Sequence, residues 1–439
     1  MLRFNRGLLK IKVYEKIKNT LKSIIPLTIW LRVRSLFPSK KINQKIRSQL
    51  ANEWKREKLD SQKNSNYPFG VNLVGYFRAA NGLGEAARGN LKVFEASDIP
   101  FSVHDFEEEV PVNQQFDFPI RDYCHEFKYN INLLHINPLR LPYLWNSFPR
   151  DVLMDRYNIG VWYWELPEFP DEWCDSFDLV DEVWVASEFV RESIQAKTNK
   201  PVIVIPPVIE VYYDQTLSRN DFGLPADAFL FLVAFDVLSI QERKNPLGAV
   251  NAFKLAFDQN DLTVGLVIKI NNVNENTKQV HHLKEELKDW KNCYFIEEIF
   301  SKERFNALLN CVDVYVSLHR SEGFGLIPAE AMYLGKPVIM TNWSGNRDFM
   351  TKDNCCPVDY ELVRIDQTIG VYKEGQLWAE PDFKQAADFM YQLYNDKYLH
   401  TTISTKAITT IHDNYSLLPI RSKICSQIQM IRKLENEFE

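Results

Sequence analysis

The hydrophobic and polar positions of this chain predict alternating strands and helices between residues 71 and 341. Short apolar runs rich in Val, Ile, Leu and Phe are typical of strands buried on both faces, and the longer segments between them have the spacing of amphipathic helices. Such alternation indicates parallel sheets covered by helices. We expect strands at 71–77, 101–106, 130–136, 158–164, 181–187 and 200–210 in a first series, and at 229–236, 262–270, 293–299, 313–318 and 337–341 in a second.

A polar, turn-rich stretch at 213–227, YDQTLSRNDFGLPAD, separates the two series and is typical of a linker. Two such units predict an α/β protein with two Rossmann-like domains facing a cleft, where a ligand sits at the carboxyl ends of the strands. The 439 residues fit this division, since one hydrophobic core stops growing at roughly 250–300 residues. The expected parts are an N-terminal extension (1–65), an N-terminal domain (66–212), a C-terminal domain (228–410) and a last helix (411–439) that packs back on the N-terminal domain.

The net charge of −6 conceals a basic N-terminal segment. Residues 1–64 hold 17 Lys and Arg against 4 Asp and Glu, whereas the remainder holds 35 against 54. Between residues 8 and 30 apolar side chains interleave with lysines, which favours a helical segment lying on an anionic membrane surface. A helix packed on the protein is the alternative. Nucleic acid is disfavoured as the partner, because the remainder is acidic and has no nucleic-acid motif.

Neither a membrane span nor a cleaved signal peptide is predicted. The longest uncharged run near the N-terminus, 23–31, is far shorter than the roughly 20 residues that cross a bilayer, and lysines at 10 and 12 interrupt the apolar run that a signal peptide needs. The seven cysteines show no metal-binding spacing, and only Cys355 and Cys356 adjoin, which is typical of idle thiols in a reducing cytoplasm. We therefore expect a cytoplasmic protein held peripherally at the inner face of the cell membrane.

Residues 319–339, HRSEGFGLIPAEAMYLGKPVI, combine a glycine turn with glutamates at 322 and 330. The Gly-Phe-Gly turn lets the backbone pass close to a ligand, and a helix is predicted to start near Pro328. The free N–H groups of a helix start suit a phosphate, and a carboxylate beside them suits a pair of sugar hydroxyls. In the alternative interpretation, Glu330 complements the helix dipole and Glu322 is solvated.

The segment EGFGLIPAEAMYLGKPVI resembles the E-x7-E signature of retaining glycosyltransferases of the GT-B fold, family 4, in which it lies in the donor-binding C-terminal domain. The glutamate spacing, the GFGL, the AEAM and the GKPVI all coincide. Residues 70–89, 179–194, 202–210 and 242–246 resemble further stretches of that family in the same order. The resemblance covers about residues 70–350 well, the C-terminal helices loosely and the basic N-terminus not at all. It implies a GT-B fold, to which we expect a basic helical N-terminal extension and C-terminal helices to be added.

The resemblance also implies a role for each matching residue. Glu322 lies against the donor sugar, Glu330 holds the nucleotide ribose, and Lys244 neutralises the diphosphate. Where the family has a phosphate-binding arginine this chain has Leu238, so Arg243 is the candidate substitute. The other expected donor-site residues belong to the glycine loops: Gly323, Phe324, Gly325, Leu326, Gly82 and Gly84.

These residue types suit the transfer of a sugar from a diphosphate. Breaking a glycosyl phosphate bond places positive charge on the sugar and negative charge on the diphosphate, so cations and helix N–H groups aimed at the phosphates lower the barrier. The chemistry requires no metal, and no cofactor besides the GDP- or UDP-linked donor is expected. A retaining hydrolase would use two carboxylates about 5 Å apart. The resemblance implies instead that the acceptor attacks on the face that the diphosphate leaves, while Glu322 orients the sugar.

The acceptor side of the cleft is less clearly marked. Many relatives have a His-Glu pair after a strand of the N-terminal domain, whereas this chain has Trp164-Glu165. His135, at the end of another strand, is a candidate for the missing histidine, although a lone histidine at a strand end more often has a structural role. Trp162 and Trp164 are candidates for a wall on which a sugar stacks, or for core residues.

The implied activity is retaining transfer of a hexose, mannose as the first candidate, to a glycan or lipid-linked glycan in the assembly of lipopolysaccharide or capsule. One alternative is a catalytically degenerate GT-B subunit that acts as a scaffold for a partner enzyme, because the arginine and the histidine are both displaced. Another is an NAD-dependent oxidoreductase, because residues 82–87, GLGEAA, match the dinucleotide pattern and Asp105 closes the next strand. The extra loop at 78–81 weakens that alternative.

Overall fold

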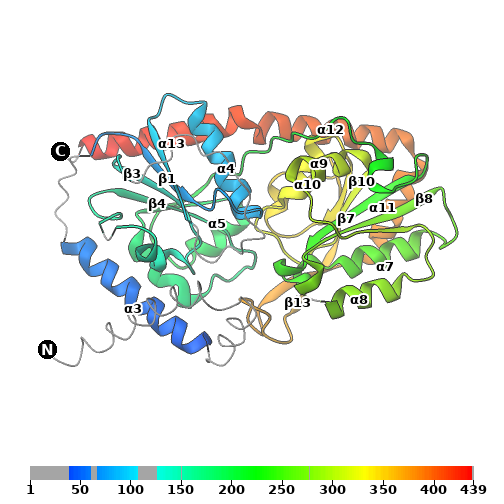
Figure 1. Cartoon of the computed structure of the whole chain (residues 1–439), viewed down its shortest axis with the longest axis horizontal. Coiled ribbons are helices and arrows are strands. Elements are labelled where there is room, and N and C mark those ends of the chain that lie inside the picture. Colours follow the sequence, from blue (N-terminus) through cyan, green and yellow to red (C-terminus); the bar gives the residue numbers. More distant parts are fainter. Residues whose placement is uncertain (1–38, 61–66, 107–125, 150, 276, 438–439) are drawn as a thin grey trace, which may run out of the picture.

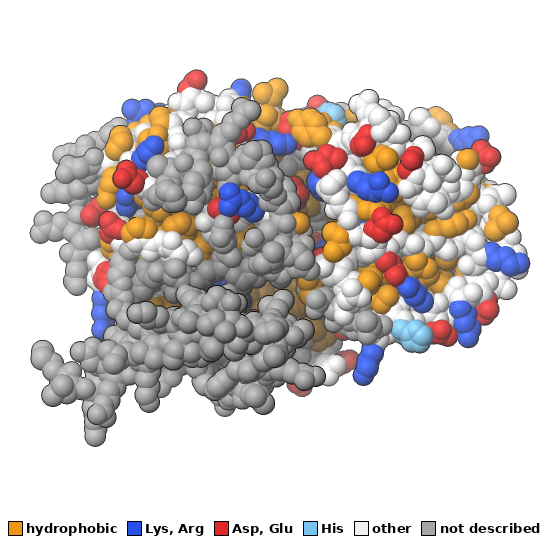
Figure 2. All heavy atoms as spheres, in the orientation of Figure 1, with side chains coloured by type: hydrophobic (Ala, Val, Ile, Leu, Met, Phe, Trp, Pro, Cys, Tyr) orange, Lys and Arg blue, Asp and Glu red, His pale blue; other side chains and the backbone are white. Residues whose placement is uncertain are grey.

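A computed structural model of the chain describes residues 39–60, 67–106, 126–149, 151–275 and 277–437. It contains two domains side by side, each built on a sheet of six parallel strands with helices packed on it (Figure 1). The predicted α/β class and the two Rossmann-like domains are confirmed. On the face in Figure 2, charged side chains of both signs are interspersed over the C-terminal domain.

The N-terminal sheet has the strand order β2-β1-β3-β4-β5-β6. All residues of β1, β3 and β5 are buried, because helices cover both faces of a parallel sheet. The strands are β1 (Val71–Gly75), β2 (Phe101–Asp105), β3 (Ile131–His135), β4 (Tyr157–Trp162), β5 (Glu182–Val185) and β6 (Val202–Val204). The helical elements are α4 (Gly82–Glu95), η2 (Leu141–Asn146), η3 (Asp171–Leu179) and α5 (Glu188–Gln195), the last capped by Ser187 as the sequence predicts.

A ladder of buried amides fixes the register of this sheet. Asn72 donates through Nδ2 to Asn132 Oδ1 at 2.9 Å, and Asn132 donates in turn to Asn158 Oδ1 at 2.7 Å. The three asparagines are direct partners on β1, β3 and β4. A buried amide without a partner is costly, so a shift of one residue in any of these strands would leave unpaired polar groups.

The C-terminal sheet has the order β12-β11-β10-β7-β8-β9. The order therefore reverses between β7 and β10, which makes a crevice at their carboxyl ends. The strands are β7 (Phe229–Asp236), β8 (Val264–Asn271), β9 (Cys293–Ile296), β10 (Val314–Ser317), β11 (Val338–Thr341) and β12 (Cys356–Val358). The helices are α6 (Gln241–Lys244), α7 (Pro246–Ala256), α8 (Thr277–Glu286), α9 (Lys302–Cys311), α10 (Leu326–Tyr333), α11 (Phe383–Asn395) and α12 (Lys397–Tyr415).

The last helix, α13 (Leu417–Glu437), lies along the N-terminal domain (Figure 1). A stripe of isoleucines at helical spacing enters the core formed with β1, β3 and α4, and Arg421 donates to the Ala96 carbonyl at 2.8 Å. The chain therefore passes between the domains after β6 and again between α12 and α13. The two passages are paired, because the Ile209 N–H donates to the Tyr415 carbonyl at 2.8 Å. The stripe consists of Ile420, Ile424, Ile428 and Ile431.

An antiparallel hairpin that the sequence pattern does not predict follows β12. It consists of β13 (Tyr360–Arg364), β14 (Leu377–Pro381) and the segment between them, and we call residues 360–381 the arm. The arm extends from the C-terminal domain toward the N-terminal domain (Figure 1). Three of its side chains, Ile365, Tyr372 and Trp378, are buried in the hydrophobic cluster of the N-terminal domain.

Helix α3 (Ser39–Asp60), the last third of the basic N-terminal extension, packs on η2 and η3. The buried Arg47 pairs with Asp175 at 2.6 Å and donates to the carbonyls of Pro138 and Glu172. For residues 39–60, the alternative of a helix packed on the protein is therefore the one observed. Residues 1–38, with the apolar and basic stretch between 8 and 30, lie outside the described residues. Among the helices that the structure describes, none has the length and apolarity needed to cross a bilayer.

We predict that Trp54 is the main anchor of α3. Its side chain is 0% exposed, and its Nε1 donates to the Pro142 carbonyl at 3.2 Å. Replacement of a buried tryptophan by alanine costs about 3–5 kcal/mol, so Trp54→Ala should lower the unfolding temperature or expose α3 to proteolysis. Lys55→Ala is the matched control, because its ion pair with Asp178 lies at the surface. Unchanged melting and proteolysis in Trp54→Ala would contradict the prediction.

Candidate active site

The crevice of the C-terminal sheet holds the residues that the sequence predicts as catalytic. Strand β7 leads to α6, which carries Arg243 and Lys244, and β10 leads to residues 319–325, which carry Glu322 and which we call the signature loop. Because β7 and β10 are neighbours, side chains 78 residues apart in sequence meet at this point.

Glu322 lies between two cations. Arg243 Nη1 is 3.0 Å from Oε2, and Lys244 Nζ is 2.5 Å from Oε1. The side chain of Glu322 is 11% exposed and that of Arg243 is 7% exposed. Burial alone would raise the pKa of Glu322, but the two cations outweigh burial and hold this pKa well below its ordinary value. Glu322 is therefore an anion at working pH and does not serve as a proton donor.

The signature loop is fixed by hydrogen bonds to Arg243 on one side and to Ser344 on the other. The Arg320 N–H donates to the Arg243 carbonyl, and the Arg243 guanidinium donates to the Ser321 carbonyl, each at 2.7 Å. The Glu322 N–H donates to Ser344 Oγ at 2.8 Å. Ser344 has φ of 74° and the β-branched Ile240, just before α6, has φ of 59°, so the backbone on both sides of Glu322 is strained.

Two glycines near Glu322 are required by close backbone contact. A Cβ on Gly345 would lie 2.1 Å from the Gly323 carbonyl oxygen, and one on Gly323 would lie 3.0 Å from the Trp164 carbonyl oxygen. The Gly323 carbonyl also accepts from Ser187 Oγ of the N-terminal domain at 2.7 Å. Phe324 points the other way, into the core of its own domain. These contacts bring the signature loop against the opposite domain.

Helix α10 begins at Leu326, two residues before the predicted start at Pro328. Gly325 is its N-cap with φ of 98°, a conformation that glycine adopts without strain and that the sequence pattern does not show. Glu330 consequently lies in the second turn of the helix. The interpretation of Glu330 as a first-turn complement to the helix dipole is wrong, because the first turn holds no acidic residue.

Glu330 is buried with one oxygen engaged. Lys302 Nζ is 2.5 Å from Oε1, whereas the buried Oε2 receives no hydrogen bond from any residue that the structure describes. Burial raises the pKa of Glu330, and Lys302 opposes this only in part. A buried acceptor without a donor is expensive unless a ligand supplies one. The geometry suits a ligand whose hydroxyl donates a hydrogen bond to Glu330 Oε2.

The glycines of the N-terminal domain face the same region. A Cβ on Gly82 would lie 3.5 Å from Leu326 Cδ1, so the N-termini of α4 and α10 approach each other across the cleft. Gly84 packs inward, since a Cβ there would lie 2.1 Å from the Ala79 carbonyl oxygen. Packing of the loop on its helix therefore explains Gly84, one of the glycines on which the dinucleotide pattern depends.

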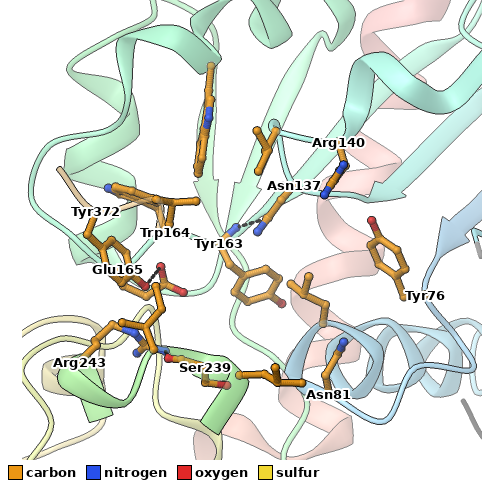
Figure 3. A pocket seen from close by; sticks show the side chains of 16 residues that line it. Tyr76, Asn81, Asn137, Arg140, Tyr163, Trp164, Glu165, Ser239, Arg243 and Tyr372 are labelled. Atoms are coloured by element: carbon orange, nitrogen blue, oxygen red, sulfur yellow. Dashed lines mark hydrogen bonds between the residues drawn. The ribbon is translucent and has the colours of Figure 1, made fainter. Parts of the chain in front are cut away.

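A cavity of about 430 Å³ lies between the domains beside this site (Figure 3). Trp164 and Glu165 line it, as the sequence analysis proposes for the acceptor side. His135 does not line it, because the ring is buried, lies 3.1 Å from Asn90 Nδ2, and has a pKa that burial lowers to about 3. The lining residues are Tyr76, Asn81, Leu83, Asn137, Leu139, Arg140, Tyr163, Trp164, Glu165, Trp173, Leu238, Ser239, Ile240, Arg243, Val371 and Tyr372.

Several of these cavity residues are missing from the sequence-based assignment. Asn137 lies two residues beyond His135 and accepts from the Tyr163 N–H at 2.8 Å, as Figure 3 shows. Asn137 and Tyr163 follow the carboxyl ends of β3 and β4, and open α/β sheets bind ligands at this position. A search of the residues just after each predicted strand would therefore have included them. Tyr372 on the arm has no such signal. Among the described residues, no group of three or more His, Cys, Asp and Glu side chains is arranged to hold a metal ion.

Comparison with known proteins identifies the C-terminal domain. Residues 218–356 match the family model described as glycosyl transferases group 1. This segment contains α6, the signature loop and α10, and therefore Arg243, Lys244, Glu322 and Glu330. No curated protein sequence matches the chain.

Solved structures extend the likeness to both domains. Sucrose-phosphate synthase from Thermosynechococcus elongatus is 13% identical, with a TM-score of 0.60 over 84% of this chain and 100% of that one. HepE from Anabaena, in complex with UDP-glucose, is 13% identical, with a TM-score of 0.57 over 83% and 100%. TarM from S. aureus is 15% identical, with a TM-score of 0.49 over 68% of this chain. The match spans only 55% of the length of TarM. This protein thus has a GT-B fold, and its C-terminal domain matches the glycosyl transferases group 1.

Proposed function

We propose that this protein is a retaining glycosyltransferase that moves a hexose from a nucleotide diphosphate sugar to a glycan or lipid-linked glycan in surface polysaccharide assembly. The match of the C-terminal domain to glycosyl transferases group 1 supports the reaction class. The observation that carries the proposal is the buried cluster of Glu322, Arg243 and Lys244 at the crevice of that same domain. The retaining mechanism, the hexose and the acceptor go beyond this match and are parts of the proposal.

The charge of the cluster suits a departing diphosphate. Arg243 and Lys244 together carry one more positive charge than Glu322 neutralises, and the N-terminus of α10 adds partial positive charge at the end of the signature loop. A leaving diphosphate develops negative charge in the transition state. Cations fixed in a partly dry site stabilise that charge without reorganising, which lowers the barrier.

Glu322 fits a role in orienting the sugar. Its carboxylate is ionised and bound by two cations, which reduces its reactivity as a nucleophile and excludes it as a general acid. A carboxylate of this kind accepts hydrogen bonds from sugar hydroxyls. In the proposed mechanism the acceptor attacks on the face that the diphosphate leaves, and a phosphate oxygen helps to take its proton.

The two ends of the donor have candidate partners in the structure. Glu330 Oε2 is the candidate acceptor for a ribose hydroxyl, because it is buried and none of the described residues donates a hydrogen bond to it. GDP-mannose is the first candidate donor, with UDP-hexoses next, and UDP-glucose belongs among the latter because the HepE structure contains it. Amide and aromatic side chains in the cavity of about 430 Å³ suit a sugar acceptor.

We further propose that residues 1–38 hold the protein at the inner face of the cell membrane. This segment has nine Lys and Arg and one acidic residue. Clusters of basic residues with apolar neighbours bind anionic lipid. Arg47 of α3 contacts Pro138 and Glu172, which adjoin cavity residues, so α3 is fixed to the part of the N-terminal domain that borders the cavity.

Glu322→Gln should abolish sugar transfer. We expect GDP-mannose or a UDP-hexose to raise the unfolding temperature of the wild type, and release of its nucleotide to fall about 100-fold or more in the variant. Glu95→Gln, which changes an exposed glutamate in the last turn of α4, is the matched control. Equal turnover by Glu322→Gln would refute the assignment of the site. A wild type that neither binds nor cleaves any sugar nucleotide would favour the scaffold alternative.

Nucleotide binding should weaken in acid because Glu330 becomes protonated. Burial raises its pKa, so the carboxylate loses its charge at a higher pH than an ordinary glutamate does, and affinity should begin to fall as the pH decreases from neutral into the acidic range. Glu330→Gln should bind UDP or GDP more weakly at neutral pH, with a smaller change across this range. Calorimetry should be carried out on the wild type and on Glu330→Gln. Protonation of the nucleotide affects binding to both proteins equally, so the difference between their pH profiles reports protonation of Glu330. Parallel pH profiles would count against the ribose role.

Removal of residues 1–38 should abolish binding to anionic vesicles. The full chain should sediment with phosphatidylglycerol vesicles and be released by salt, because screening weakens surface charge attraction. Phosphatidylcholine vesicles should bind neither protein. The truncated chain keeps α3 and its contacts, so its fold serves as the control. Equal sedimentation of the full chain and the truncated chain would contradict the membrane proposal.

A further inference from the structure

The arm is the part of the C-terminal domain that enters the opposite domain most deeply. It begins four residues after the segment that matches glycosyl transferases group 1, which ends at residue 356. Tyr372 is 3% exposed, and its ring centroid lies 5.7 Å from that of Trp164. The arm therefore completes a hydrophobic cluster most of whose other members belong to the N-terminal domain.

The base of the arm is attached to the signature loop. The guanidinium of Arg320 binds both carboxylate oxygens of Glu380, at 2.6 Å and 3.1 Å, and the Ala379 N–H donates to the Arg320 carbonyl at 2.9 Å. Paired contacts of this kind restrict rotation as well as distance. The arm and the residues around Glu322 consequently move as one unit.

The outer part of the arm is attached to the N-terminal domain. Lys373 Nζ lies 2.5 Å from Glu172 Oε2, and Gln376 Nε2 donates to the Glu168 carbonyl at 3.1 Å. Gly370, with φ of 59°, brings the turn of the arm against Ile240, because a Cβ there would lie 2.8 Å from Ile240 Cδ1. The arm thus bridges the cleft beside Arg243.

Glu165 is held from two sides in the cavity. The Tyr372 hydroxyl donates to Glu165 Oε2 at 3.0 Å, as Figure 3 shows, and Ser321 Oγ donates to the Glu165 carbonyl. Burial raises the pKa of Tyr372 well above its ordinary value, so its hydroxyl remains a donor at working pH. Both groups that hold Glu165 come from the C-terminal domain, although Glu165 belongs to the N-terminal domain.

We infer that the arm forms one wall of the acceptor subsite and that Tyr372 is a positioning residue, which holds the Glu165 carboxylate toward a hydroxyl of the acceptor sugar. This inference rests on the proposed function and adds the element that selects the acceptor. Val371 and Tyr372 line the cavity opposite Asn137 and Arg140, so the subsite is built from both domains. A sugar glycoside then binds well only while the domains are closed on the arm.

The test is binding of octyl glycosides of glucose, mannose, galactose and N-acetylglucosamine to the full chain, measured by the change in tryptophan fluorescence. Trp164 and Trp173 line the cavity and contribute to this signal. We expect one glycoside to bind and Tyr372→Phe, which keeps the ring, to weaken its binding about tenfold, as expected for loss of a hydrogen bond to a carboxylate. Tyr398→Phe removes a hydroxyl from an 82% exposed tyrosine on α12 and should change nothing. The thermal shift with UDP or GDP should be the same in all three proteins.

A double variant separates positioning from bulk structure. If Tyr372 acts through Glu165, Glu165→Gln should weaken glycoside binding, and Tyr372→Phe with Glu165→Gln should bind no more weakly than Glu165→Gln alone. Additive losses, or wild-type binding by Tyr372→Phe, would overturn the inference. So would a wild type that responds to nucleotides but to none of the glycosides, and that result would leave the proposed donor reaction standing. Absence of any nucleotide response would instead count against the proposed function.

Discussion

The structure of the cleft depends on one carboxylate that holds two neighbouring cations. Arg243 and Lys244 are consecutive residues, and without Glu322 their charges would repel each other in a site that is largely closed to water. The attraction across the crevice brings the segment after β7 against the segment after β10. The strained backbone at Ile240 and Ser344 persists because these contacts determine the geometry more strongly than local preference does.

From this point the contacts extend outward in both directions. Arg320 connects the signature loop to the arm, the arm connects to Glu165 and η3, and Arg47 connects η3 to α3. The donor side and the acceptor side therefore share one continuous set of polar contacts. Each of these links is a hydrogen bond in which the donor or the acceptor is a charged side chain, and such bonds are strong and directional.

The sequence predicts the parts of this arrangement that are local. Alternating apolar runs locate the strands, and the glutamate spacing locates Glu322 and Glu330, because both depend on residues close together in the chain. Contacts between distant segments escape such reasoning. Nothing near Tyr372 indicates that it meets Glu165, and nothing near Trp54 indicates that it packs beside Pro142. The sequence predicts His135 in the cavity, whereas the structure places Asn137 there. The position at which β3 ends determines which residue reaches the cavity, and sequence patterns locate strand ends poorly.

The paired passages at Ile209 and Tyr415 have a consequence for motion. The two segments that connect the domains lie side by side and share a hydrogen bond, so they define a hinge. Rotation about this hinge would separate the domains without unfolding either one. Lys373, Gln376 and the Tyr372 hydroxyl would then leave their partners together, whereas Glu322, Arg243 and Glu330 would stay on one body. Opening would therefore break the contact between Tyr372 and Glu165 while the ion pair of Glu322 with Arg243 stays intact, so the two halves of the cleft differ in how much they depend on closure.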